Sequence, residues 1–145
     1  PILEANDIIK SYSKIGSEIP VLNGLSISIN SGEILVLIGP SGSGKSTLLN
    51  ILGTLDADFT GNLIIDEISI TNTVELADIR RDKLGFVFQF HHLLPEFTVL
   101  ENLLIPKMIA GHTHDDCSKD IIKMLELIGL KDRIGHYPNE ISVLK

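Results

Sequence analysis

The sequence predicts an α/β fold, in which strands and helices alternate along one chain. Residues 2–12 and 21–29 are rich in β-branched side chains in partial alternation, a pattern that predicts two strands. Residues 34–38 form a continuous apolar run between glycines, which is typical of a strand buried on both faces of a parallel sheet. Residues 46–55 repeat leucine and isoleucine at helical spacing and predict the helix that follows.

Shorter segments complete the predicted order of elements. Residues 13–18 have the composition of a turn and join the first two strands. Residues 63–70 predict a further strand, and residues 84–88 predict a short one.

The last third of the chain predicts two helices. Thr98 and Glu101 form a capping-box pattern that opens a helix running toward Ile105. Pro106 is expected to interrupt this helix or end it early, because proline lacks the amide hydrogen that a helix interior uses. Gly129 closes a second, amphipathic helix. Its apolar stripe consists of Ile121, Met124, Leu125 and Ile128.

Composition and charge restrict the class of protein. The chain has 145 residues, the size of one domain, and 43% of them are apolar and 21% charged. A formal net charge of −7 argues against a nucleic-acid partner, because a phosphate backbone attracts a basic surface. This charge still allows a local anion site, since backbone amides and one or two cations are enough to bind phosphate.

The sequence also predicts a location. The single cysteine, Cys117, forms no internal disulfide and suggests a reducing compartment. No apolar run approaches the roughly 20 residues that span a bilayer, and no secretory signal opens the chain. We therefore expect a cytoplasmic protein that reaches a membrane only through a partner. Because the sequence starts at Pro1, either an initiator Met has been removed or the sequence is a piece.

A glycine-rich segment before the first predicted helix carries the clearest functional signal. It matches the phosphate-binding pattern G-x-x-x-x-G-K-[ST] at every fixed position. Its residues are Gly39, Pro40, Ser41, Gly42, Ser43, Gly44, Lys45 and Ser46. Gly42 and Gly44 allow backbone conformations that turn amides toward phosphate, and Lys45 adds a positive charge. The Ser46 hydroxyl suits Mg²⁺, and the N-terminus of the following helix favours an anion.

The residues around this motif carry a family resemblance. It rests on the segment 21–33 before the motif and on the residues from Ser41 to Asn50, with Gly53, Leu55 and Asp56 after them. These segments resemble those of the ABC-transporter ATPases. The resemblance implies that ATP and Mg²⁺ are the cofactors.

The same resemblance implies a P-loop NTPase fold of the ABC ATPase type in one partial domain, residues 1–145. A strand-rich antiparallel part is expected at about residues 1–33, and an incomplete RecA-like parallel core at about 34–89. The start of the helical subdomain is expected at about residues 90–145.

The resemblance also assigns roles to individual residues. Tyr12 stands where the family has an aromatic side chain that stacks on adenine. Gln89 stands where the family has a glutamine that reaches Mg²⁺ and the attacking water, and Lys45 and Gln89 are the expected catalytic residues. The expected Mg²⁺ contacts are Ser46 and Gln89. The expected ATP contacts are Tyr12, Gly39, Pro40, Ser41, Gly42, Ser43, Gly44, Lys45, Ser46 and Thr47.

The run from Gln89 to Asn102 is similar to the lipoprotein-releasing ATPases of this family. In the family, residues after the glutamine contact integral-membrane transporter subunits, which implies a peripheral position at the cytoplasmic face of a bacterial inner membrane. Four apolar residues are expected either to dock such subunits or to pack in the core. They are Phe90, Leu93, Leu94 and Phe97.

The histidines do not predict a metal site. His91 and His92 are adjacent rather than at helical ligand spacing, and we interpret them as structural or interface residues. His112, His114 and Cys117 are expected to cap or start the next helix.

The resemblance extends to about residue 142 and then fails. The family's signature, Walker B carboxylates and switch histidine are absent from these 145 residues. Family members hydrolyse ATP as homodimers in which one subunit's signature closes over the other's nucleotide. We therefore expect this chain alone to bind nucleotide weakly and to hydrolyse it negligibly. The absent segment also supplies sheet strands in the family, so residues 34–38 are expected to lack neighbours that bury them.

Other functions remain open. The chain is alternatively the ATPase of a related macrolide exporter or cell-division complex, or a truncated module that binds nucleotide or membrane subunits without hydrolysis. The run from His91 to Pro95 favours lipoprotein release. A GTPase is disfavoured because no Asn-Lys-x-Asp guanine reader is present, and a kinase because its signatures are missing.

Overall fold

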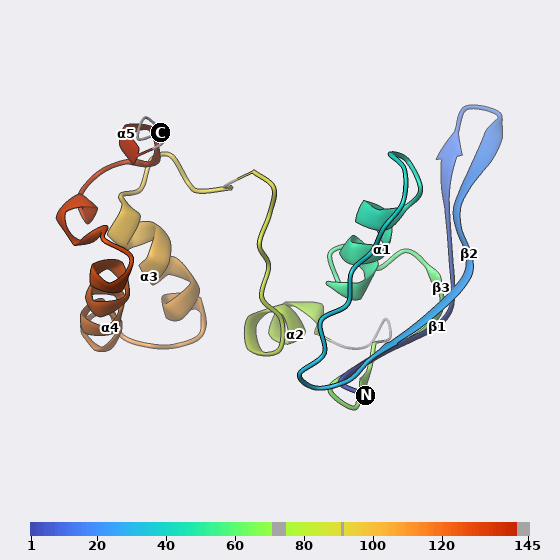
Figure 1. Cartoon of the computed structure of the whole chain (residues 1–145), viewed down its shortest axis with the longest axis horizontal. Coiled ribbons are helices and arrows are strands. Elements are labelled where there is room, and N and C mark those ends of the chain that lie inside the picture. The colour runs from blue at the N-terminus through green and yellow to red at the C-terminus, as the bar shows by residue number, and fades with distance from the viewer. Residues whose placement is uncertain (71–74, 91, 142–145) are drawn as a thin grey trace. The chain divides into compact units, whose positions relative to one another are not determined.

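The computed structural model describes residues 1–70, 75–90 and 92–141, and His91 therefore lies outside the described residues. The chain forms two compact units, Pro1–Phe86 and Val87–Lys145 (Figure 1). Each unit has its own apolar core and is described by itself.

The first unit contains an antiparallel sheet in the order β2-β1-β3-β4. The strands are β1 (Leu3–Lys14), β2 (Ser17–Ile29), β3 (Thr60–Ile65) and β4 (Ile68–Ser69). The two N-terminal strands predicted from the sequence are thus confirmed and form a hairpin. Its turn is shorter than expected, because pairing continues up to Lys14 opposite Ser17 and Gly16 takes a φ of 81°.

The prediction of one strand over residues 63–70 was wrong, because this segment reverses direction. Strands β3 and β4 pair antiparallel, with Ile65 opposite Ile68. Asp66 and Glu67 form the turn with φ values of 47° and 66°. Two-residue hairpins favour positive φ at both positions, and glycine or asparagine usually marks them. Neither glycine nor asparagine occurs at these two positions, so the sequence did not indicate the turn.

Helix α1 (Lys45–Leu52) confirms the helix predicted after the glycine-rich segment. Figure 1 shows it beside the sheet of the first unit. Its buried residues Leu48, Ile51 and Leu52 join side chains of the sheet in one core. The other core residues are Ala5, Ile8, Leu22, Leu63, Ile65 and Ile79. Burying side chains of this size contributes about 1.5–3 kcal/mol each. A helix this short is marginal on its own, so packing against the sheet stabilises it.

Residues 34–38 do not form the buried strand that their apolar run predicted. Ile34, Val36 and Ile38 are 89%, 71% and 91% exposed. A central strand depends on neighbours on both sides, and among the described strands none pairs with this segment. The expected lack of neighbours is therefore confirmed. The short strand predicted at residues 84–88 is likewise irregular backbone, for the same reason, and Val87 is 102% exposed.

The sequence did not predict helix α2 (Leu76–Asp82), which also belongs to the first unit. Ile79 is the residue that it contributes to the core. Arg80 Nη1 donates a hydrogen bond of 2.7 Å to the carbonyl of Thr54, which connects α2 to the loop after α1.

The second unit is helical. Helix α3 (Val99–Ile109) begins with the predicted capping box: the Glu101 amide donates to Thr98 Oγ1, and the Thr98 amide donates to Glu101 Oε2. The prediction that Pro106 stops this helix was wrong, because the helix continues to Ile109. The turn after the proline still closes, since the Ala110 amide donates to the Pro106 carbonyl at 3.1 Å.

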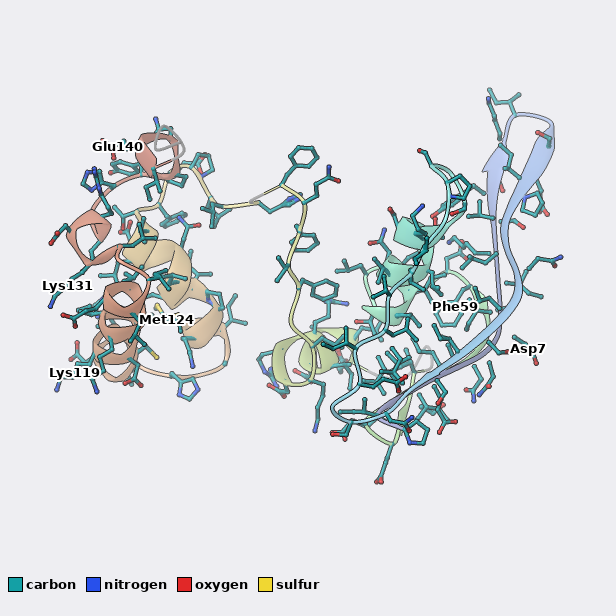
Figure 2. The ribbon with its side chains drawn as sticks, viewed as in Figure 1. Asp7, Phe59, Lys119, Met124, Lys131 and Glu140 are labelled. Carbon is teal, nitrogen blue, oxygen red and sulfur yellow. The ribbon has the colours of Figure 1, made fainter. Side chains whose placement is uncertain are left out.

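Helix α4 (His114–Leu127) packs on α3. Of the three residues expected to cap or start it, His114 is its first residue and His112 precedes it, while Cys117 is buried. Ile121 and Leu125 are buried as expected, but Met124 and Ile128 are more than half exposed, so the predicted stripe is only half right. Met124 is labelled on α4 in Figure 2. Cys117 lies in the core with Ile121 and Leu125.

The chain after α4 forms two short elements, η1 (Lys131–Arg133) and α5 (Pro138–Ile141). Gly129 has a φ of 73° and ends α4 as predicted, since the Leu130 amide donates back to the Leu125 carbonyl at 2.7 Å.

Candidate nucleotide-binding site

A cavity of about 580 Å³ opens where the glycine-rich segment meets α1. This volume is within the range of small-molecule sites. The lining residues are Val21, Ser41, Gly42, Gly44, Lys45, Ser46 and Thr47. Six of these seven were predicted from the sequence to contact ATP. The other predicted loop residues, Gly39, Pro40 and Ser43, line an adjoining, mostly apolar hollow of about 270 Å³, which Gly44 and Lys45 also line.

The glycines are required by the conformation of the loop. Gly42 and Gly44 have φ values of 80° and 88°, which side chains rarely adopt. A Cβ on Gly44 would also lie 3.0 Å from Leu22 Cδ2 and 3.1 Å from the Val21 carbonyl. A Cβ on Gly39 would lie 2.7 Å from Ser43 Oγ. The loop therefore folds back on itself and on β2 more closely than a larger residue would permit.

The N-terminus of α1 is left without a side-chain cap. Gly44 is the N-cap residue, and it has no side chain that accepts from the first-turn amides. The amides of Lys45, Ser46 and Thr47 belong to the first turn, where a helix has no partner of its own for the N–H groups. These donors and the helix dipole make the cavity a suitable place for an anion.

Lys45 contributes a positive charge that no ion pair among the described residues neutralises. Its Nζ donates to the carbonyls of Gly39 at 2.8 Å and Pro40 at 2.7 Å, and to Ser43 Oγ at 3.3 Å. All three acceptors are neutral oxygens. Within the described part of the chain, the ion pairs of lysine and arginine do not include Lys45. An anionic ligand would therefore meet a positive charge that these neutral oxygens leave unbalanced.

Tyr12 is not among the residues that line the cavity. It pairs with Ile19 across the hairpin, and Val21, two residues further along β2, does line it. The residue is 44% exposed, so part of its ring is open to solvent. Gln89 belongs to the second unit, where it lies in an exposed bend, and its predicted role stays a prediction.

Sequence reasoning missed a buried lysine beside Tyr12. Lys10 is only 4% exposed, and its Nζ lies 2.9 Å from Asp56 Oδ2 and 3.2 Å from Asp58 Oδ2. It also donates to the Asp58 carbonyl. The alternation of the strand could have indicated its burial. Side chains two residues apart in a strand share a face, so Lys10 lies on the same face as the core residue Ile8.

The charges of this cluster shift its pKa values in opposite directions. Burial lowers the pKa of Lys10, but the hydrogen bonds that Lys10 donates to Asp56 and Asp58 outweigh this effect and raise the pKa above its ordinary value. Burial raises the pKa of Asp56, but the hydrogen bond from Lys10 and the Asp58 amide hold it below its ordinary value.

The apolar residues after Gln89 are accessible in the second unit rather than buried in its core. Their exposed fractions are at least 40% for all four of Phe90, Leu93, Leu94 and Phe97.

No group of three or more potential metal ligands occurs among the described residues. No described helix has the length and hydropathy needed to cross a membrane.

Comparison with known proteins agrees with this geometry. Residues 22–143 match the family described as ABC transporter. The lipoprotein-releasing system ATP-binding protein LolD of Alcanivorax borkumensis is 45% identical over 144 residues, covering 98% of this chain and 63% of that protein. LolD of Porphyromonas gingivalis is 46% identical over 143 residues, covering 97% of this chain and 64% of that protein. The chain thus spans less than two thirds of these relatives.

A solved structure gives the same result for the fold. The dimeric ATP-binding cassette MJ0796, in a post-hydrolysis state with ADP and Pi, superposes with a TM-score of 0.86 at 34% identity. The match covers 96% of this chain and 62% of that one. The expected fold class, an antiparallel β part with part of a P-loop ATPase, is therefore confirmed. From the family match, the identities and the superposition together, this chain belongs to the ABC transporter family of ATP-binding proteins.

Proposed function

We propose that this chain is the nucleotide-binding part of an ATPase subunit that couples ATP hydrolysis to the release of lipoproteins from a bacterial inner membrane toward the outer membrane. The observation that carries the proposal is the uncapped start of α1 beside Lys45, whose charge meets only neutral oxygens. The two relatives named LolD support the choice of lipoprotein release among the activities of the family.

In this proposal the loop and α1 hold the phosphates of ATP. Amides of the first helical turn and Lys45 bind the terminal phosphates, since both lie on the cavity. Ser46 would hold Mg²⁺, which would neutralise phosphate charge during transfer, and Gln89 keeps its predicted role as a second Mg²⁺ contact. Tyr12 stacks on adenine through the open part of its ring.

The proposed partners are integral-membrane subunits of the LolC/LolE type and a second copy of the ATPase subunit. The exposed residues Phe90, Leu93, Leu94 and Phe97 are the proposed contact with the membrane subunits, because aromatic and aliphatic side chains are suited to the centre of an interface. The chain would then act at the cytoplasmic face of the inner membrane as a peripheral subunit.

We further propose that these 145 residues alone bind ATP without appreciable turnover. Hydrolysis needs groups that orient water and stabilise the transferring phosphoryl group, and this sequence offers no Walker B carboxylate or signature loop for that purpose.

Calorimetric titration with ATP and Mg²⁺ tests the nucleotide site. Lys45→Ala should weaken binding about 10- to 100-fold, because a charge-assisted hydrogen bond contributes about 1.5–3 kcal/mol. Lys119→Ala is the matched control, since it removes the same charge from an exposed position on α4 (Figure 2). Equal affinity in the wild type and Lys45→Ala would exclude the proposed site. Phosphate release by the wild-type chain at about 1 s⁻¹ or faster would exclude the proposed lack of turnover.

A further inference from the structure

The buried ammonium of Lys10 connects the strand that carries Tyr12 to the helix that starts at the phosphate loop. Its partner Asp56 lies in the loop after α1, and the Asp56 amide donates to the Asn50 carbonyl of that helix at 3.1 Å. Helix α1 therefore follows its N-cap Gly44 beside the cavity, and its last turn is bonded to the residue whose carboxylate holds Lys10.

Tyr12 contacts the same cluster in two ways. Lys10 Nζ lies over its ring, 5.0 Å from the centroid. The Tyr12 hydroxyl donates to Asp56 Oδ2 at 3.5 Å. One face of the ring is thus occupied by a cation and its hydroxyl end is tied to a carboxylate, while the residue remains 44% exposed.

We infer that Lys10 is a positioning residue for nucleotide binding: it holds the Tyr12 ring at a set place relative to the phosphate loop so that adenine can stack on the ring's open face. This inference rests on the proposed function, in which Tyr12 contacts adenine. The cluster has the stiffness that this role needs, because Lys10 is 4% exposed and is held by both Asp56 and Asp58. A solvent-exposed pair would not restrict a side chain to one place.

The composition of the chain offers a direct probe of this inference. There is no tryptophan, and the two tyrosines are Tyr12 and Tyr137. Tyr137 lies in the second unit, so Tyr137→Phe leaves Tyr12 as the only source of aromatic fluorescence above that of phenylalanine. ATP and inorganic tripolyphosphate are the two ligands to compare, because only ATP has a base that can stack.

In the Tyr137→Phe background, ATP should bind about tenfold more tightly than tripolyphosphate and should quench Tyr12 fluorescence. Stacking of a base on an aromatic residue typically changes affinity about 5- to 150-fold. Adding Lys10→Met should weaken ATP binding about 3- to 10-fold and reduce the quenching, while tripolyphosphate binding stays within about twofold. Lys10→Arg, which keeps the cation, should restore at least half of the lost ATP affinity.

Two results would overturn the inference alone. One is unchanged ATP affinity and quenching in Lys10→Met, while Tyr12→Ala loses the tenfold preference for ATP over tripolyphosphate. The other is an equal loss of ATP and tripolyphosphate binding, which would mean that Lys10 supports the fold and not the ring. If circular dichroism shows that Lys10→Met is unfolded, Asp56→Asn takes its place under the same criteria. A background protein that binds neither ligand, or binds both equally without quenching, would overturn the proposed function as well.

Discussion

Lys10 and Lys45 lie in the same unit and each meets three or more oxygens, yet they serve opposite purposes. Lys10 is buried and faces two carboxylates, so its charge is neutralised inside the protein. Lys45 lines the cavity and faces two carbonyls and a hydroxyl, so these partners do not neutralise its charge. The partners of a lysine, and not its presence, therefore separate a structural cation from one that can bind an anion.

The largest expected difference between the two lysines is in how much each contributes to the free energy of unfolding. Lys10→Met should lower the free energy of unfolding by about 2–3 kcal/mol, somewhat less than breaking a fully buried pair, because Asp58 is exposed and can be solvated. Lys45→Met should change it by less than about 0.5 kcal/mol, as is usual away from buried networks. Urea unfolding followed by circular dichroism measures both. Equal losses in the two variants would contradict the distinction.

A second prediction concerns how the Lys45 loop is built. Gly44→Ala should lower the free energy of unfolding by about 2 kcal/mol. It places a side chain on a residue with a φ of 88° and brings that side chain against Val21 and Leu22. Gly42→Ala is the matched control, since its φ of 80° carries the same backbone strain but its added Cβ meets nothing within 4 Å. Gly42→Ala should lower the free energy of unfolding by about 1 kcal/mol. Thermal unfolding would refute the explanation if Gly42→Ala proved the more damaging.

The pKa shifts predict how the Lys10 cluster responds to pH. Asp56 has its pKa below the ordinary 3.8, so its stabilising contribution is present above that pH and is lost as the pH falls through the folded-state value. Lys10 has its pKa above the ordinary 10.5, so its contribution is present below that pH and is lost as the pH rises. The difference in unfolding free energy between the wild type and Asp56→Asn should be constant from about pH 5 to 9 and shrink below pH 3.8. A difference that persists undiminished at pH 2 would show that the pair is not its source.

The smallest expected effect is that of salt. Raising NaCl from about 0.05 to 0.5 M should weaken ATP binding a few-fold, because Lys45 is accessible to counterions. The stability lost in Lys10→Met should change by less than about 0.5 kcal/mol over the same range, because Lys10 is buried. A salt dependence of the Lys10 effect as steep as that of ATP binding would remove the contrast between the two cations.

Much of the site was predictable because its signals are local. The spacing of Gly39, Gly44, Lys45 and Ser46 specifies a loop whose conformation depends on glycine dihedrals and on the helix after it. The capping box of Thr98 and Glu101 is confirmed for the same reason, since both hydrogen bonds close within one turn.

The failures of prediction involve segments whose state depends on distant residues. The apolar run 34–38 has the composition of a buried strand, but burial requires partners that are not among the described strands. The turn at Asp66 and Glu67 was missed because the pairing of β3 with β1 and β4 forces positive φ on residues that do not favour it.

By itself, the sequence determined the hairpin of β1 and β2, helix α1, the glycine-rich loop and the family, because each depends on residue types at short, regular spacing. Only the tertiary structure decided that Lys10 is buried against Asp56, 46 residues away, and that Lys45 keeps an unneutralised charge. The physical reason is that the electrostatic state of a lysine depends on which oxygens the fold places around it, and that placement comes from long-range packing.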